Sequence, residues 1–598
     1  MRHAIRHALL ATLALGVLMS CATVPKNTGT VTQEDAGAAL EELGSHWWDA
    51  TLQSSPFWAT HLGDRRFDQR VPDVSEAAEK AHLAMVREHL KILESIDVDA
   101  LSPRDKVVRD VLHTKLTGSL DAEVCQDRLW GVDHLWGPHI QLAQMTSSHS
   151  IRSPEDVATL ETRYRAAPAW FKAHADNLRE GLSKGYSPYH LAVSKVVEQA
   201  RALASKEASK TPFVSAVKWP ETWDAKTKAT ATDVLTRAVD EAIKPALVRY
   251  ADALEREIYP RSRRENVGAA GLPNGDRCYG SKIRSYTGSN LGPKAIHRIG
   301  LEELKTLRKD MLEIAEEVSG KRDLKAFMET LESRKDQVYQ SRDELLADAQ
   351  KIMDRAFKKL PTMFGRLPKT PIEIKEMEAY RAKDAPAAFY HPAPADGSRK
   401  AAYVVNTYAP ESRPRYNMEA LSFHEAVPGH HLQIAIARET PDIPSFQRYM
   451  GQTAYVEGWA LYSELLAAEM GLYTGPLDHF GKLNFQAWRA CRLVVDTGLH
   501  ALGWSRDQAI EFMVEHTANS RADVEVEIDR YIVWPGQALG YMMGRIAIQG
   551  FRAKAEKTLG DAFDLRGFHD EILRYGPVPI DVLEGIVNRW VERVQSQN

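Results

Sequence analysis

Apolar residues recur at three- and four-residue spacing along most of this chain, which is the period of helices that bury one face. The pattern predicts a series of helices over the first 360 residues. Breakers such as Pro56 and Pro212 separate them, and the Gly-, Asn- and Pro-rich segment 261–293 is predicted to be a loop and hinge. We therefore expect an N-terminal helical lobe over 36–260 and a second, catalytic lobe over 261–598. The predicted helices cover residues 36–52, 75–95, 104–119, 154–183, 224–257, 294–318, 323–333 and 342–359.

Two segments have the composition of strands. IEIKEM (372–377) alternates polar and apolar residues, and AAYVVNTY (401–408) is β-branched and aromatic. The fold class expected is therefore mainly α, with a small β-sheet beside a cleft. Segment 401–408 is either an edge strand that binds an extended peptide or a buried structural strand. Asn406 within it is a candidate substrate-binding residue.

The N-terminus has the features of a bacterial lipoprotein signal. Arg2 and Arg6 precede an apolar run, residues 8–19, that is too short to span a bilayer. The run ends in Leu-Met-Ser-Cys, which fits a lipobox and predicts cleavage before a lipidated Cys21. We expect a signal peptide over 1–20, a tether over 21–35, and membrane attachment through the lipid alone. Ala22, where Asp would favour the inner membrane, favours the outer membrane facing the periplasm; an ordinary secretory signal is the alternative.

Charge and cysteine content narrow the function classes. The 77 basic and 81 acidic residues give a net charge of −4 and are interspersed, so no nucleic-acid partner is expected. With Cys21 lipidated, Cys125, Cys278 and Cys491 remain. A chain of this length can bury a large core without disulfides, and one pair is possible without being assignable. The oligomeric state stays open.

HEAVPGHH, residues 424–431, carries the main chemical signal. His next to Glu is typical of the zincin helix, in which His binds Zn²⁺ and Glu is general base for a metal-bound water. The usual second His, at i+4, is here Pro428. Pro428 cannot continue a regular helix, and Gly429 tolerates a distorted backbone. A local bulge that loops out two residues would bring His430 beside His424, so we predict these two as ligands, with His431 as the alternative to His430.

The third ligand is expected downstream. Segment 455–471 has helical periodicity, and Glu457 and Glu464 lie seven residues apart on one otherwise apolar face. Carboxylates on an inward face are costly unless they are paired or bind a metal. We predict Glu457 as the third ligand of one Zn²⁺ per chain, and Glu464 as an acceptor that orients a ligating His or pairs with an Arg.

Several sequence blocks resemble one family. HEAVPGHHLQ, AYVEGWALYSE, DRYIVWPGQALGYMMG (529–544), GDRCYGSKIRSYTGSNLGPKAIHRIGL (275–301) and FHDEILRYGPVPIDVLE (568–584) are similar to the signature blocks of the domain-of-unknown-function family 885 of bacterial lipoproteins. That family's site resembles the site of the gluzincin metallopeptidases, which implies a mostly helical peptidase-like fold. The family is poorly characterised, so the resemblance implies no particular substrate.

Other polar residues are secondary candidates. Peptide hydrolysis needs a donor to the developing oxyanion, and Arg530, Tyr531 and Tyr541 fit that role, with Tyr531 preferred; Gln537 would contact substrate or cap a helix. Three further interpretations concern residues away from the HEAVPGHH segment. They are Asp133, His134 and His139 as loop or cleft-lining residues, His569 as a surface or helix-cap residue, and Trp47 and Trp48 as core residues.

Together these features predict a zinc-dependent peptidase that hydrolyses short peptides at the bacterial envelope, with Glu425 as general base. One alternative is a metal-dependent amidohydrolase acting on a non-peptide amide or a cell-wall fragment. The other is a catalytically silent, peptide-binding lipoprotein. The intact Glu425 argues against the silent protein, because a scaffold has no physical need for a general base.

Overall fold

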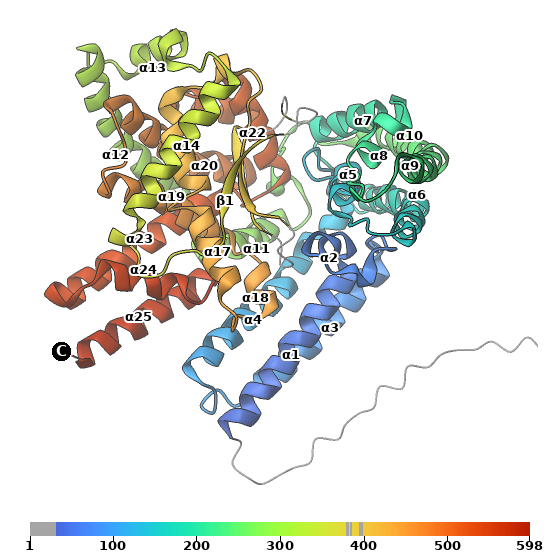
Figure 1. The fold of residues 1–598 in the computed structure, drawn as a ribbon, viewed down its shortest axis with the longest axis horizontal. Helices are drawn as coiled ribbons and strands as arrows, with labels where there is room; N and C mark the ends of the chain where they lie inside the picture. The colour runs from blue at the N-terminus through green and yellow to red at the C-terminus, as the bar shows by residue number, and fades with distance from the viewer. Residues whose placement is uncertain (1–31, 378–381, 383–385, 394–398, 598) are drawn as a thin grey trace, which may run out of the picture.

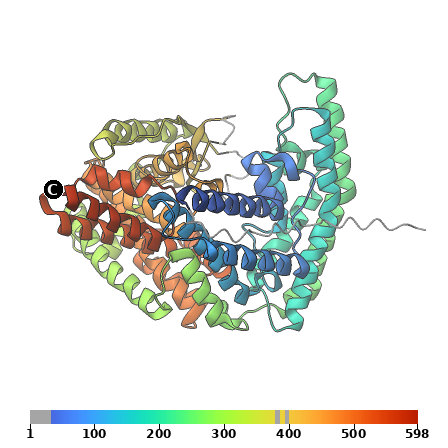
Figure 2. The same cartoon turned by 90° about the horizontal axis from the view of Figure 1, so that it is seen from below.

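The computed structural model describes residues 32–377, 382, 386–393 and 399–597. The fold is mainly α-helical with one small three-stranded sheet, which confirms the predicted fold class. Figures 1 and 2 show the helices in two perpendicular views. Cys21, the predicted signal peptide and most of the predicted tether lie outside the described residues.

The helices of the first half follow the apolar periodicity closely. The predicted helix 224–257 is α9 and α10 joined by a π-helical turn, Val239–Ile243, with a second one, Leu254–Ile258, after α10. The helices of this half are α1 Gln33–Ser54, α2 Pro56–Leu62, α3 Glu76–Ser95, α4 Pro103–Asp121, α5 Pro138–Ser148, α6 Pro154–Ser183, α7 His190–Ser205, α8 Pro212–Ser215, α9 Ala225–Ala238 and α10 Lys244–Ala253.

Side-chain caps fix where several of these helices begin. Ser75 and Ser102 accept backbone N–H bonds at the starts of α3 and α4. At α1, the Thr32 side chain accepts from the Asp35 N–H while the Asp35 side chain accepts from the Thr32 N–H. This capping box starts α1 at Gln33, three residues before the predicted start of the helix at residue 36.

The second half is also mainly helical. α11 occupies residues 275–287 of the segment predicted to be a loop and hinge, and its Cys278 forms a disulfide with Cys125. The loop prediction is therefore wrong for 275–287, while the rest of 261–292 contains no α-helix. The helices are α11 Gly275–Thr287, α12 Pro293–Ser319, α13 Leu324–Ser333, α14 Arg342–Lys359, α16 Met418–Glu425, α17 His430–Glu439, α18 Ser445–Tyr449, α19 Thr453–Glu469, α20 Pro476–Ala501, α21 Arg506–His516, α22 Arg521–Val533, α23 Leu539–Leu559, α24 Leu565–Leu573 and α25 Ile580–Gln597.

Two large hydrophobic cores hold the molecule together, and each joins both halves of the chain. One packs α6, α7 and α10 with α20 and α22, and the other packs α1 and α4 with α16, α19 and α25. Figure 2 shows α1 running between the C-terminal helices and the long helices of the first half. Residues 36–260 therefore share their cores with the second half, and the cores do not follow the division predicted at residue 260.

The sheet has the order β1-β3-β2. β1 (Ile372–Glu376) pairs in parallel with β3 (Ala401–Val405), and β2 (Ala388–His391) pairs antiparallel with it, placing Tyr390 opposite Tyr403. All five residues of β3 are buried between the two outer strands. β3 is thus the buried structural strand of the two alternatives, and the strand at the edge beside α16 is β2, which sequence reasoning missed.

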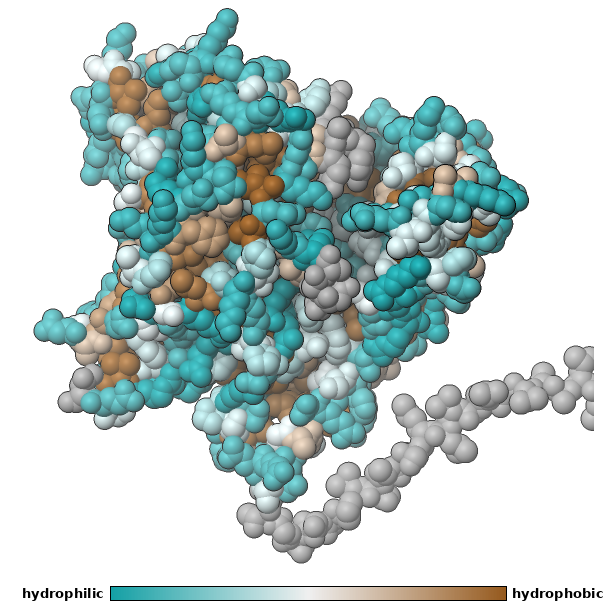
Figure 3. All heavy atoms as spheres, viewed as in Figure 1, coloured by the Kyte–Doolittle hydropathy of each residue, from teal (hydrophilic) through white to brown (hydrophobic). Residues whose placement is uncertain are grey.

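The face of the molecule shown in Figure 3 is mainly hydrophilic, and its hydrophobic residues form small separate patches. Among the described helices, none has the length and apolar character needed to cross a bilayer.

Candidate metal centre and its cavity

The HEAVPGHH segment breaks the helix instead of bulging it. α16 ends at Glu425, residues 426–429 leave helical geometry, and α17 begins at His430. The N–H of His431 then bonds the carbonyl of Ala426 at 3.0 Å. A Cβ on Gly429 would lie 2.0 Å from the carbonyl oxygen of His424, so only glycine fits this corner. The predicted two-residue bulge is wrong in detail, because Pro428 and Gly429 end one helix and start another.

This break brings His424 and His430 together despite their spacing of six. Their ring centroids lie 4.8 Å apart. A ring nitrogen of each histidine and a carboxylate oxygen of Glu457 all lie within 4.8 Å of one another. Glu457 Oε2 is 3.6 Å from His424 Nε2 and 3.4 Å from His430 Nε2. Tetrahedral ligands at zinc bond lengths of roughly 2.0–2.1 Å are themselves about 3.3 Å apart. The donor set and its spacing therefore fit one zinc ion.

Other contacts hold these side chains in place. Glu464, which is fully buried, accepts a bond from His424 Nδ1 at 2.8 Å, so Nε2 of that ring faces Glu457. Gln486 of α20 donates to the other Glu464 oxygen at 2.8 Å. Such carboxylate–imidazole contacts orient metal-binding histidines. His430 Nδ1, in contrast, is buried without a hydrogen-bond partner among the described residues.

The electrostatics of the cluster suit a cation. Burial alone would lower the pKa of His424, but the nearby carboxylates of Glu457 and Glu464 outweigh this and raise that pKa to about 9. Burial would raise the pKa of Glu457, but the nearby imidazoles of His424 and His430 hold that pKa well below its ordinary range. The carboxylates thus favour positive charge at the point where the three side chains meet.

His431 faces away from this cluster. Its Nδ1 lies 3.1 Å from the hydroxyl of Tyr390, its ring is fully buried, and burial lowers its pKa to about 4. Among the described residues, His431 is not part of the group that His424, His430 and Glu457 form. Of the two alternatives for the second ligand, the arrangement favours His430.

Helix α19 is fixed against the break by close packing. A Cβ on Gly458 would lie 2.5 Å from the backbone of Gly544 in α23, so the two helices meet backbone to backbone. The indole N–H of Trp459 donates to the carbonyl of Pro428 at 3.0 Å. These contacts hold Glu457 opposite the two histidines.

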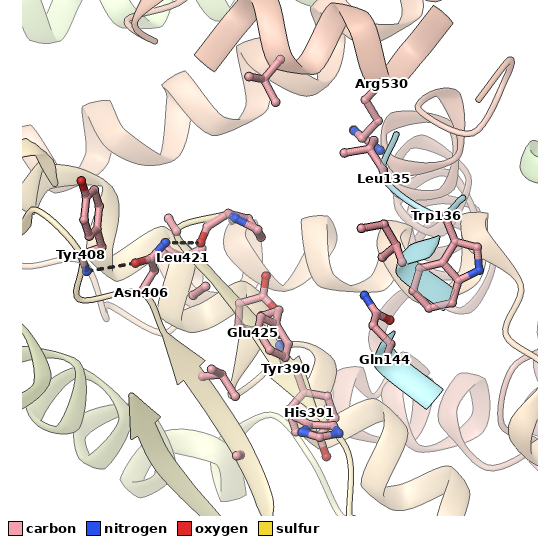
Figure 4. Close-up of a pocket in the computed structure, with 18 of the residues that line it drawn as sticks. Leu135, Trp136, Gln144, Tyr390, His391, Asn406, Tyr408, Leu421, Glu425 and Arg530 are labelled. Carbon is pink, nitrogen blue, oxygen red and sulfur yellow. Dashed lines mark hydrogen bonds between the residues drawn. The ribbon is translucent and has the colours of Figure 1, made fainter. Parts of the chain in front are cut away.

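The cluster opens into a cavity of about 3770 Å³, lined by α2, α5 and α8 on one side and by β2, α16, α19, α20 and α22 on the other. Glu425 lines it, and one of its carboxylate oxygens accepts the backbone N–H of Tyr390 in β2 at 2.8 Å. Figure 4 shows Glu425 and Tyr390 on one wall, with Leu135, Trp136 and Gln144 across the cavity. Trp136 is half exposed, although large aromatic side chains are usually covered. The volume far exceeds the roughly 300–1000 Å³ of small-molecule pockets, which suits a polymeric or peptide ligand.

Comparison with known proteins identifies the family. A model described as "Bacterial protein of unknown function (DUF885)" matches residues 56–587. The chain belongs to the DUF885 family. The chain is similar to a crystal structure of a "putative lipoprotein" from Colwellia psychrerythraea, with 27% identity, a TM-score of 0.87, and coverage of 93% of this chain and 100% of that one. A second such structure, from Shewanella oneidensis, shares the fold with 19% identity and a TM-score of 0.71, covering 92% and 99%. No match was found among curated proteins.

The predicted oxyanion donors of this DUF885 chain occupy different environments. Tyr531 is buried; its hydroxyl donates to Glu527 at 2.6 Å and accepts from Arg492 at 2.8 Å, and it does not line the cavity. Tyr541 does line the cavity, and no hydrogen bond from its hydroxyl to a described residue is present. Burial, followed by the nearby negative charge of Glu457, raises the pKa of Tyr541. Tyr541 therefore replaces Tyr531 as the candidate donor, because the Tyr531 hydroxyl is already occupied.

The remaining predicted residues have mainly local roles. Arg530 lines the cavity and donates to Gln537 at 2.7 Å, and Gln537 itself lies outside the cavity lining. Asn406 borders the cavity, but its amide donates to the carbonyls of Ala382 and Pro386, so it holds the segment before β2.

The minor sequence interpretations have mixed outcomes in this DUF885 fold. His134 lines the cavity and Trp47 is buried against Phe446, as expected. His139 is fully buried instead of lining a cleft. His569 is also fully buried and contacts the Tyr462 hydroxyl at 2.9 Å, so its assignment to the surface is wrong.

Sequence reasoning overlooked the cavity face of α20. Phe485, Trp488, Arg489 and Arg492 all line the cavity, and both arginines are almost fully buried. The signal was present as two arginines three residues apart in the segment 487–495, whose other residues are apolar. Charge in such a segment is costly unless it is paired or binds a ligand.

Proposed function

We propose that this protein is a zinc-dependent peptidase of the bacterial envelope that hydrolyses short peptides. The observation that carries the proposal is the group formed by His424, His430 and Glu457 beside Glu425 at the wall of a large cavity. Two histidines and one carboxylate leave the fourth tetrahedral position open, which is the composition of catalytic zinc sites. Glu464, by fixing the His424 ring, supports the same interpretation.

Zinc bound by these three side chains would act as a Lewis acid on a water molecule and on the scissile carbonyl. Glu425 would take the proton from the attacking water and pass it to the leaving amine. The Tyr541 hydroxyl would donate to the oxygen on which negative charge develops. The N–H of Tyr390 holds the Glu425 carboxylate toward the cavity before substrate arrives.

The envelope location rests on the N-terminal sequence and on the description of the similar Colwellia protein. We propose that Cys21 is lipidated and that the protein sits on the outer membrane, facing the periplasm. Substrates there would be peptide fragments narrow enough to enter the cavity between α5 and α16.

Metal content of the purified protein and of single-site variants tests the ligand assignment. We expect about one zinc per chain in the wild type and in His431→Ala, and a loss of zinc in His424→Ala and His430→Ala. Glu425→Gln should keep its zinc but lose hydrolysis of a short-peptide library by a factor of roughly 10³ or more. Zinc binding that survives His430→Ala but not His431→Ala would refute the assignment of His430. A protein that binds no zinc under any loading condition would refute the peptidase proposal.

A further inference from the structure

One face of α20 presents buried positive charge to the cavity. Phe485, Trp488, Arg489 and Arg492 stand at positions i, i+3, i+4 and i+7, so they share one side of the helix. Arg489 is 5% exposed and Arg492 is 4% exposed. The Arg489 guanidinium lies over the rings of Phe485 at 4.5 Å and Trp488 at 4.9 Å, which holds it flat against the wall.

The carboxylates close to these arginines are too few to balance their positive charge. Among the described residues, no carboxylate lies within ion-pair distance of Arg489. Its Nη1 donates a long hydrogen bond of 3.4 Å to the carbonyl of Phe485, and its Nε has no partner among these residues. Glu527 forms ion pairs with both Arg492, at 3.1 Å, and Arg530, at 2.9 Å, while Arg492 Nη1 has no hydrogen-bond partner in the described part of the chain. A buried guanidinium without a counter-charge is costly. Three guanidinium groups with one close carboxylate among the described residues can therefore bind a further anion.

The position of this charge relates it to the metal centre. Arg489 follows Gln486 by about one helical turn, and Gln486 bonds Glu464, which bonds His424. On the other side, the Arg492 guanidinium lies 4.3 Å from the ring of Tyr541. Figure 4 shows Arg530 projecting into the same cavity from α22, beside Leu135. Arg489 is also close enough to Glu464 and Glu457 for their negative charges to act on it. Because an extended peptide advances about 3.3–3.6 Å per residue, we expect an anion bound here to belong to a residue one or two positions from the scissile bond.

We propose that Arg489 and Arg492 form a carboxylate-binding subsite, so that the enzyme acts on peptides with a carboxylate one or two residues beyond the scissile bond. This inference rests on the proposed peptidase function and narrows it to removal of C-terminal residues. The planar guanidinium groups match a carboxylate with paired N–H bonds. The carboxylate comes either from the peptide C-terminus or from an acidic side chain near it.

Peptide binding to the Glu425→Gln variant tests the subsite without turnover. Three probes are compared by calorimetry: N-acetyl-trialanine as the free acid, the same peptide as its C-terminal amide, and an amide with Glu as its last residue. We expect at least one carboxylate probe to bind about tenfold tighter than the plain amide, because charge-assisted bonds to buried guanidinium groups are lost in the amide. Tight binding of the free acid alone identifies the C-terminus as the source, and tight binding of the Glu amide alone identifies the side chain. Tight binding of both shows that the subsite accepts a carboxylate from either source.

Arginine variants assign the effect. Arg489→Gln, made in the Glu425→Gln background, should remove most of the acid–amide difference, and Arg489→Lys should retain part of it. Arg308→Gln is the matched control, because Arg308 is an exposed arginine of α12 that also lines the cavity. The proposal fails if the acids and the amide bind equally to the parent variant, or if the difference survives Arg489→Gln and Arg492→Gln. If no peptide is hydrolysed by the wild type but the acid preference still depends on Arg489, the peptidase proposal fails and the subsite stands.

Discussion

At the residue scale, the role of a polar side chain in this protein depends on its contacts as well as on its chemical type. Tyr531 and Tyr541 are ten residues apart, and both are mostly enclosed by protein. The hydroxyl of Tyr531 completes a network with Arg492 and Glu527, while Tyr541 borders the cavity. The first is therefore expected to support the cavity wall and the second to meet substrate.

Phenylalanine substitutions separate these two roles. Tyr541→Phe should lower kcat for peptide hydrolysis by roughly 10²-fold with intact zinc content, because an oxyanion donor is lost. Tyr531→Phe should change kcat little but lower the unfolding free energy by about 1–3 kcal/mol, because Arg492 and Glu527 lose a buried partner. Steady-state kinetics and urea unfolding of both variants measure this. A large kcat loss in Tyr531→Phe with normal activity in Tyr541→Phe would reverse the assignment.

The ligand candidates could be chosen from the sequence, whereas the choice between Tyr531 and Tyr541 as donor could not, for a physical reason. His424 and His430 lie on one short segment, so local backbone chemistry at Pro428 and Gly429 suffices to bring them together. The environment of Tyr531 depends on Arg492, thirty-nine residues away, and that of Arg489 depends on how α20 packs against α19. Such contacts leave no trace in local periodicity.

At the element scale, the break between α16 and α17 creates the candidate site. The carbonyls of Phe423 and His424 approach Gly429 so closely that a methyl group would meet them at 2.4 and 2.0 Å. Any side chain at this position must push α17 away from α16. The position of His430 relative to His424 depends on the same backbone.

Gly429→Ala is expected to disrupt the site through its backbone. We expect the zinc content to fall by at least half and the unfolding free energy to drop by about 1–3 kcal/mol, as for overpacked positions. Gly118→Ala in α4 is the matched control, because a Cβ there has open space; it should be neutral or stabilise by about 0.5–1 kcal/mol. Metal analysis and urea unfolding measure both. Normal zinc content in Gly429→Ala would show that the helix break tolerates a side chain.

Some elements with long, regular periodicity were predicted well, but the long helices α7, α20 and α25 and the short strand β2 were not predicted. α6 begins and ends at the predicted residues because its apolar face repeats over thirty residues. β2 has four residues, too few to show alternation, and it forms only because β3 lies beside it. In α11, Gly275 and Gly280 suggested a loop, yet Gly275 allows close contact with the carbonyl of Ala269.

At the scale of the whole molecule, the two halves of the chain are joined by shared cores and one covalent link. The Cys125–Cys278 disulfide connects the segment after α4 to α11, across 153 residues of sequence. Both sulfurs belong to buried residues. A persistent disulfide fits an oxidising compartment such as the periplasm, which agrees with the N-terminal signal. Sequence spacing could not assign this pair, because it is formed by the tertiary fold.

Removing the disulfide is expected to weaken the whole fold. The double variant Cys125→Ser/Cys278→Ser should lower the unfolding free energy by about 2–4 kcal/mol, because the unfolded chain regains the freedom of a long closed loop. Cys491→Ala is the control, since Cys491 is a buried thiol outside any disulfide and its removal leaves the covalent link intact. Urea unfolding with and without a reducing agent measures the difference, and the reducing agent should affect the wild type and the control but not the double variant. Equal unfolding midpoints for the oxidised wild type and the double variant would mean that the shared cores alone hold the two halves together.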